Sequence, residues 1–160
     1  MRHRLVTIAV FVLVIAGCNK KQSVDKVTYV DEDDPKMNAA IEKARSSVNK
    51  FIAALQSPKA GRSDFSVKMA FTDRHGTEHM WLSPVSYDGT KFHGTVNNEP
   101  ETVKNVRMGK KVTVEPSKIS DWMYVEKGKL VGGYTLRVLR DKMSPKERAE
   151  FDRSVPFVIE

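Results

Sequence analysis

Residues 75–79, H-G-T-E-H, carry side chains that could bind a metal ion. The spacing H-x-x-E-H brings two histidine ligands and a glutamate together when all of them lie on one face of a helix. Gly76 interrupts the motif here, and the flanking residues are typical of strands and a turn. We therefore expect no metal site and no cofactor, with His79 a satisfied or exposed polar residue.

Four consecutive acids at positions 31–34, D-E-D-D, are a second candidate for a metal site, because carboxylates suit calcium. The run lacks the alternating ligands and the central glycine of a calcium-binding loop. Pro35 follows directly, and proline is favoured at the first position of a helix. We favour the interpretation that Asp34 caps this helix, with the acids at the positive end of its dipole.

Five residues in or beside the predicted strands are candidates for binding a ligand: Trp81, Asn98, Glu99, Asp121 and Trp122. The two indole rings could form the wall of a groove, and the polar side chains could orient a peptide or glycan in it. Alternatively, the polar residues cap turns, with Asp121 accepting hydrogen bonds from nearby backbone amides.

The sequence contains no G-x-S-x-G motif, no phosphate-binding loop and no dinucleotide fingerprint. We therefore expect no catalytic residue and no enzymatic activity. The enzyme alternative is a hydrolase of cell-wall material that depends on Glu99 or Asp121.

The N-terminus is typical of an export signal, with basic residues followed by an apolar run at 5–15 that is too short to span a bilayer. Residues 14–18, V-I-A-G-C, resemble the lipobox of bacterial lipoproteins. The resemblance implies cleavage before Cys18 and attachment of lipid to its thiol, with two or more acyl chains giving durable anchoring. Asn19 after the cysteine favours transfer to the outer membrane, with the domain facing the periplasm.

The chain is basic, with a formal charge of +7. Loss of residues 1–17 removes two arginines, which leaves 25 Lys and Arg against 20 Asp and Glu and a charge of +5. Export argues against nucleic acid and favours anionic lipid, an envelope polymer or an acidic protein as partner. Because basic residues are scattered among acids, a solvated surface is the simpler explanation. Cys18 is the single cysteine, so no disulfide forms within the monomer.

Downstream of the acid run, the pattern predicts one long helix and then a series of short strands. Apolar residues recur three and four apart over residues 37–55, which gives one stripe along about five turns. The period falls to two over residues 65–71, with Ser66, Lys68 and Ala70 on a mostly polar face. Further strands are predicted at residues 27–30, 77–85, 91–96, 102–106 and 111–115.

Residues 119–139 predict a hairpin around which the rest of the chain is organised. Two β-favouring arms flank a tight turn at Lys127-Gly128, and two glycines at 132–133 make room for another backbone or a bulge. A capped helix at 144–153 and a short apolar segment at 155–159 that pairs at an edge complete the chain. The expected fold class is α+β, with a long N-terminal amphipathic helix on a curled antiparallel sheet or small barrel and a short C-terminal helix.

Several motifs together resemble the YegJ-like family of bacterial proteins, a domain of unknown function. They are A-A-I at 39–41, E-H-M-W-L at 78–82, N-E-P at 98–100, I-S-D-W-M at 119–123 and G-G-Y-T at 132–135. The resemblance covers residues 29–140 and implies no activity that could be transferred. We divide the chain into a signal peptide (1–17), a lipid-anchored tether (18–28) and a YegJ-like α+β domain (29–160).

The sequence thus predicts a membrane-anchored, non-catalytic module of the cell envelope that binds a protein or an envelope polymer. The main alternative is an immunity-type protein that neutralises an envelope-acting toxin. The pattern indicates no oligomeric state.

Overall fold

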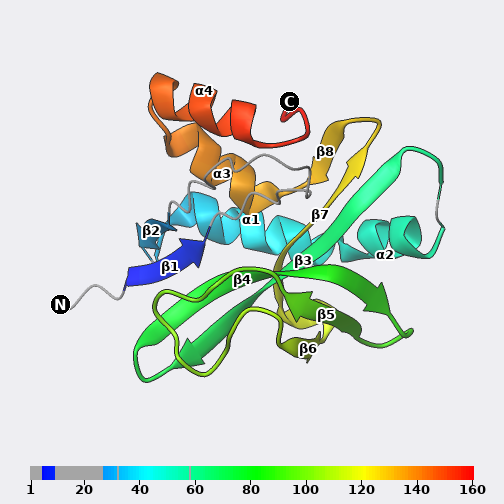
Figure 1. Ribbon diagram of the computed structural model, residues 1–160, viewed down its shortest axis with the longest axis horizontal. Helices are drawn as coiled ribbons and strands as arrows, with labels where there is room; N and C mark the ends of the chain where they lie inside the picture. Colours follow the sequence, from blue (N-terminus) through cyan, green and yellow to red (C-terminus); the bar gives the residue numbers. More distant parts are fainter. Residues whose placement is uncertain (1–4, 10–26, 32, 58) are drawn as a thin grey trace.

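The chain forms an α+β arrangement in which helices cover a sheet (Figure 1). The computed structural model describes residues 5–9, 27–31, 33–57 and 59–160. Predictions about residues 10–26, among them cleavage before Cys18 and its lipid, lie outside the described residues. In chain order the elements are β1 (Leu5–Ala9), β2 (Val27–Asp31), α1 (Pro35–Ser46), α2 (Val48–Gln56), β3 (Arg62–Asp73), β4 (Gly76–Tyr87), β5 (Phe92–Val96), β6 (Lys111–Val114), a 3-10 turn (Pro116–Lys118), β7 (Ile119–Glu126), β8 (Lys129–Gly132), α3 (Tyr134–Lys142) and α4 (Pro145–Ser154).

The strands β3 to β8 form an antiparallel sheet that is open, so the prediction of a small barrel or strongly curled sheet is wrong. Long β4 pairs with β3 on one edge, and with β5 and β1 on the other. On its other side β1 pairs with β2, so the strand predicted at residues 27–30 is confirmed and lies at an edge of the sheet. Closure would require the edge strand β8 to pair with another edge of the sheet, but among the described residues β8 pairs with β7 and, through Lys129 and Val158, with the C-terminal segment.

The predicted turn between β7 and β8 is confirmed, with Lys127 and Gly128 at φ of 50° and 76°. The prediction that the second arm continues as a strand to residue 139 is wrong. The strand ends at Gly132, and the next residues form α3, whose Leu136 and Leu139 are buried one helical turn apart.

The predicted single long helix is also wrong, because α1 and α2 meet at a break at Ser47. The Ser47 hydroxyl donates to the carbonyl of Lys43 at 2.6 Å, and the Trp122 indole donates to the carbonyl of Ala44 at 2.9 Å. The Ser47 amide also donates to the carbonyl of Lys43, at 3.2 Å, so these side chains add donors for the carbonyls at the end of α1. The two helices are thereby free to take different directions over the sheet.

The predicted strand at residues 102–106 is a loop. Val103 and Val106 are buried, which explains the apolar pattern that suggested a strand. The backbone amides of Thr102 and Val103 donate to the carboxylate of Glu78 rather than to a neighbouring strand. Burial of two valines three residues apart does not require a strand ladder.

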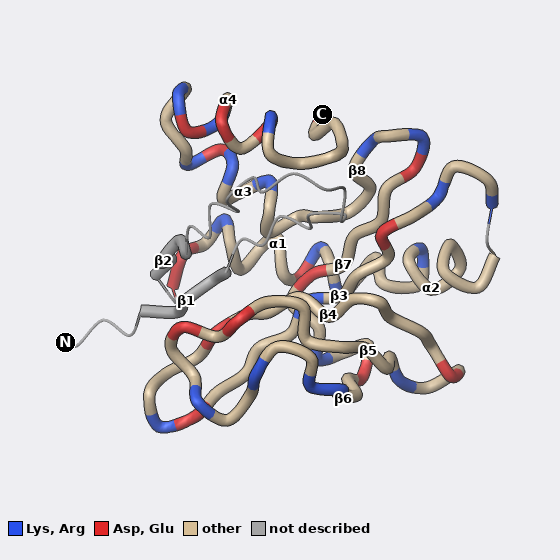
Figure 2. Tube along the Cα trace, in the orientation of Figure 1, with Lys and Arg blue, Asp and Glu red and all other residues tan. Residues whose placement is uncertain are grey.

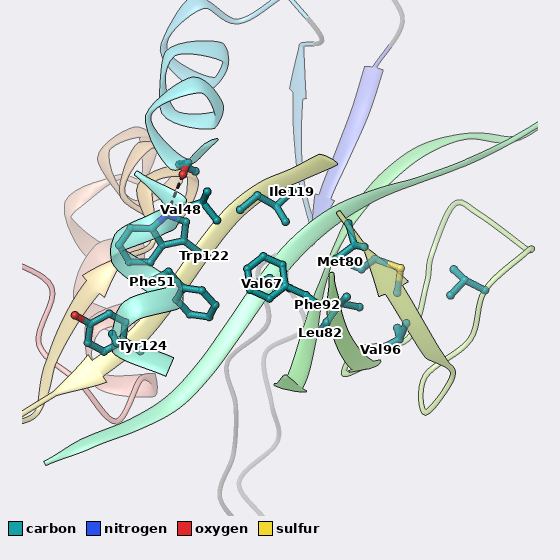
Figure 3. Packing of buried hydrophobic residues seen from close by; sticks show 14 of the residues in the cluster. Val48, Phe51, Val67, Met80, Leu82, Phe92, Val96, Ile119, Trp122 and Tyr124 are labelled. Carbon is teal, nitrogen blue, oxygen red and sulfur yellow. Dashed lines mark hydrogen bonds between the residues drawn. The ribbon is translucent and has the colours of Figure 1, made fainter. Parts of the chain in front are cut away.

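Two apolar clusters lie against the sheet. The first, which we call the aromatic core, surrounds Phe51 and contains Val67, Trp122 and Tyr124 (Figure 3). The second, which we call the helical core, lies among α1, α3, α4 and the sheet and consists of Met37, Trp81, Met123, Leu130, Leu136, Leu139 and Phe151. Neighbouring residues of β7 contribute to different clusters, because successive side chains of a strand point to opposite faces.

The predicted helix caps are confirmed. Asp34 accepts a hydrogen bond from the Met37 amide at 2.9 Å, with Pro35 at the first position of α1. Ser144 and Glu147 form the capping box of α4. Within the described residues, no helix is long and apolar enough to span a membrane.

Candidate functional site

A charged residue of β3 lies at the centre of the most unusual environment in the molecule. Lys68 pairs with Trp81 of β4 on one side and with Asp121 of β7 on the other. Paired residues of neighbouring strands project to the same face, so the three form a row across the sheet. Thr135 of α3 lies over this row, and Lys68, Asp121 and Thr135 are all buried. We call these last three residues the polar layer.

The face of Ser66, Lys68 and Ala70, predicted to be the mostly polar one opposite a buried face, is itself covered in the structure. Ser66 and Lys68 are buried, and Ala70 is partly buried. The apolar residues of α1 and α3 pack on this face. A two-residue period shows that a strand has two faces, but it does not show whether a helix later covers the polar one.

Asp121 holds the start of α3. Its Oδ1 accepts hydrogen bonds from the amides of Trp122 at 2.8 Å and Tyr134 at 3.1 Å. Its Oδ2 accepts from the Thr135 amide at 2.8 Å and the Thr135 hydroxyl at 2.6 Å. The N-cap residue of α3 is Gly133, which has no side chain to offer. A carboxylate from the neighbouring strand thus satisfies the free amides at the positive end of the helix.

Lys68 reaches the carboxylate through the same threonine. Its Nζ donates to the Thr135 Oγ1 at 2.9 Å, and that hydroxyl donates in turn to Asp121. The ammonium also lies 4.6 Å from the centre of the Trp81 ring, within the range of a cation–π interaction. Burial lowers the pKa of Lys68 to about 8, although the charge of Asp121 opposes that shift. Burial raises the pKa of Asp121, against the effects of Lys68 and of the hydrogen bonds from Thr135 and Trp122.

His79 lies on the same face, two residues before Trp81, and is partly buried. Burial, together with the positive charges of Lys68 and Arg45, lowers the pKa of His79 to about 4. The imidazole is therefore neutral near pH 7. Its neighbour Glu78 is buried on the other face of the sheet. The Glu78 carboxylate accepts hydrogen bonds from the backbone amides of residues 101–103 and so orders the loop after β5. Within the described residues, no group of three His, Cys, Asp or Glu side chains could hold a metal ion.

The two glycines before α3 make the joint between strand and helix possible. Both have positive φ, 77° at Gly132 and 61° at Gly133. A Cβ on Gly132 would collide with the carbonyl oxygen and ring of Trp122. The Gly133 amide donates to that same carbonyl at 2.8 Å. The I-S-D-W-M and G-G-Y-T motifs are therefore two halves of one structure, in which Asp121 fixes the helix and Trp122 supports the turn.

The structure separates the five residues predicted to bind a ligand. Trp81 and Asp121 share the face of the polar layer, on either side of Lys68. Trp122 lies on the opposite face, in the aromatic core. The remaining two residues follow β5: Asn98 is buried and donates to the carbonyl of Glu99 at 3.4 Å, and Glu99 is exposed. The two indole rings therefore do not form the walls of one groove.

Three features of this site were missed from the sequence: the burial of Lys68, the role of Thr135 and the neutral state of His79. The sequence signal that points to this site is the pair of motifs I-S-D-W-M and G-G-Y-T, which contain Asp121 and Thr135. No pattern in the sequence indicates that Lys68 contacts these motifs, because it lies 67 residues before Thr135. Chemically, the layer contains an amine with a near-neutral pKa, a hydroxyl that relays a hydrogen bond and a carboxylate, and all three are enclosed by the fold.

Comparison with known proteins identifies the family. The family model described as "uncharacterized protein conserved in bacteria (DUF2314)" matches residues 34–157. The uncharacterized protein YegJ of Escherichia coli (strain K12) is 34% identical over 150 residues, covering 94% of this chain and 95% of that protein. The putative ankyrin repeat protein NMB1133/NMB1171 of Neisseria meningitidis serogroup B is 36% identical over 134 residues, which are 79% of this chain and 53% of that protein. No solved structure matches the chain.

The predicted resemblance to the YegJ-like proteins is thus confirmed, and the chain belongs to the DUF2314 family of bacterial proteins, to which no function is assigned.

Proposed function

We propose that this chain is a lipid-anchored protein of the cell envelope whose domain is a non-catalytic binding module for a protein or an envelope polymer. Residues 1–17 direct export and are removed, and Cys18 carries the lipid that holds the domain at the membrane, preferably the outer membrane on its periplasmic side. The observation that carries the proposal is the V-I-A-G-C sequence directly after a basic and apolar N-terminus.

The location of the polar layer argues against catalysis by its residues. A general acid, base or nucleophile must reach the reacting atom of its substrate. Lys68 and Asp121 are fully buried and hydrogen-bonded to groups that belong to α3 and β7. These hydrogen bonds hold α3 against the sheet.

The relatives support a self-contained domain. The family match ends at residue 157 and begins at residue 34, after the proposed anchor and tether. The Neisseria relative carries its matching region within a protein of which it makes up about half. Of the described elements, removal of residues 1–17 takes away only β1 and leaves β3 to β8 with their helices.

The anchor is tested with cells that express the full chain and are fed a clickable fatty acid. We expect label on the wild-type chain and on the control variant Ser23→Ala, and none on Cys18→Ala. Label that persists on Cys18→Ala, or an uncleaved chain free in the cytosol, would refute the anchor.

The binding module is tested separately by in-cell crosslinking and by an assay of cell-wall hydrolysis. A reproducible crosslink to one protein or polymer supports binding, and a toxin as that partner would favour the immunity-type role. Hydrolysis by the wild-type chain that is abolished in Glu99→Gln, an exposed position, would replace the proposal with the hydrolase alternative.

A further inference from the structure

A turn between β5 and β6 presents an apolar side chain to solvent. The amide of Lys110 donates to the carbonyl of Arg107 at 3.2 Å, and Gly109 has a φ of 81°, so Met108 lies at the tip of a tight turn. Met108 is 49% exposed, and only one other large apolar residue among those described, Val158, is similarly exposed. An exposed methionine at a turn tip has no role in the core.

The residues around this tip are basic. Segment 104–111, K-N-V-R-M-G-K-K, contains four basic residues and no acid, and we call it the basic turn. All four basic residues are exposed, and Figure 2 shows basic residues in blue on the chain leading into β6. The nearest acids along the chain are Glu101, before the segment, and Glu115, which pairs with Lys91 at 3.7 Å. The carboxylate of Asp73 accepts a hydrogen bond from the amide of Lys104 at 2.6 Å, at the start of the segment. No acid lies within the segment itself, next to Met108.

The basic turn is held rigidly by the body of the domain. Val103 and Val106 anchor it in the aromatic core. The Gly109 amide donates to the carbonyl of Val96 at 2.8 Å, and the Asn105 side chain donates to the carbonyl of Thr72 at 2.9 Å. A surface that is ordered before binding loses little conformational entropy when it binds.

We infer that the basic turn docks on an anionic lipid surface. Met108 enters the boundary between headgroups and acyl chains, and Arg107 and Lys111 lie among the lipid phosphates. A soluble polyanion would use the same cations but gain nothing from an apolar tip, and for this reason we favour lipid. Each basic residue near such a surface strengthens binding about fivefold. The contact is separate from the proposed lipid on Cys18 and acts in addition to it.

Vesicle binding of the full chain carrying Cys18→Ser, which has no thiol to acylate, tests the inference independently of the anchor. The probes are vesicles of phosphatidylcholine with and without phosphatidylglycerol. We expect Arg107→Glu with Lys111→Glu to weaken binding to the anionic vesicles by at least about twentyfold. Neither side chain has a hydrogen bond or ion pair with the described residues, so the fold is not disturbed. The matched control is Lys146→Glu with Arg153→Glu, two exposed residues of α4, which should bind like the parent chain.

Met108→Ala separates lipid from a soluble polyanion. On anionic vesicles we expect severalfold weaker binding, and on inorganic polyphosphate we expect no change. Equal vesicle binding by the parent chain and by the Arg107→Glu and Lys111→Glu variant would overturn the inference. So would a Met108→Ala variant that binds vesicles like the parent, since the basic turn would then be a site for polyanions in general.

Discussion

The two faces of the sheet are built from the same strands by different chemistry. On one face Phe51 meets Phe92 and Trp122 at ring-centre distances of 5.7 and 5.5 Å (Figure 3). On the other face Lys68 and Asp121, one position along from residues of the aromatic core, form charge-assisted hydrogen bonds with α3. A shift of one residue along a strand thus separates an apolar environment from an ionic one.

The difference teaches which face stabilises the fold and which specifies it. Apolar burial is strong but non-directional, so the aromatic core favours compactness without fixing where a helix begins. Hydrogen bonds require particular distances and angles, and Asp121 satisfies α3 at its first residues only. The polar layer therefore fixes the position of α3, even though a buried ion pair adds little net stability.

The largest expected effect comes from removing the carboxylate. Asp121→Ala removes the charge that opposes the lowering of the Lys68 pKa, so buried Lys68 must either stay charged without a counterion or release its proton. The substitution also leaves the first amides of α3 without an acceptor. Breaking a buried pair in this way costs about 3–5 kcal/mol of unfolding free energy. Urea denaturation followed by circular dichroism measures the loss.

Asp141→Ala is the control for this experiment, because Asp141 is an exposed acid of α3, the helix that Asp121 holds. Its effect should stay within about 0.5 kcal/mol. If Asp121→Ala destabilised the protein no more than Asp141→Ala, the polar layer would not be what positions α3.

The lowered pKa of Lys68 makes the free energy of unfolding depend on pH. The pKa of Lys68 is about 8 in the folded protein, and in the unfolded chain it has its ordinary value of 10.5. Between these values the unfolded state binds more protons, so the free energy of unfolding rises with pH. Relative to Lys68→Met, the wild type should gain roughly 3 kcal/mol between pH 8 and 10.5.

Subtraction of the Lys68→Met curve removes the contributions of other lysines and tyrosines, which titrate in the same range. Denaturant unfolding at several pH values gives both curves. A constant difference between them would mean that Lys68 keeps its ordinary pKa and is not desolvated.

Local signals in the sequence predicted much of the fold. The turn at Lys127-Gly128, the cap at Asp34 and the capping box at Ser144 depend on residues close together in the chain, and each is confirmed. The alternating strands were found for the same reason. The break at Ser47 was not found, because part of what stabilises it comes from Trp122, far along the chain.

The candidate site was less predictable, since its parts are brought together only by tertiary structure. Lys68 has the position of an exposed strand residue until α3 covers it, and α3 itself was predicted as the second arm of a hairpin. Its Val138 and Thr135 favour strands locally, and the acceptor that stabilises the helix start lies 14 residues earlier, at Asp121. The specific motifs around Asp121 and Gly132 indicated importance, but the structure shows that they support a joint in the fold.

The smallest expected effect tests whether burial is what distinguishes the polar layer from other ion pairs. Arg140 of α3 binds Asp152 of α4 through two hydrogen bonds of 2.7 Å, with side chains 20% and 37% exposed. Because water screens this pair, Asp152→Asn should cost about 1 kcal/mol or less, and Glu150→Gln, an exposed acid of the same helix, close to nothing. The loss should shrink in 1 M salt, where the Debye length is about 3 Å, whereas the loss in Asp121→Ala should not change. Suppose that Asp152→Asn lost as much unfolding free energy as Asp121→Ala and that salt did not change the loss. Hydrogen-bond geometry alone would then account for the stability of both pairs, and the burial of Lys68 and Asp121 would add nothing to it.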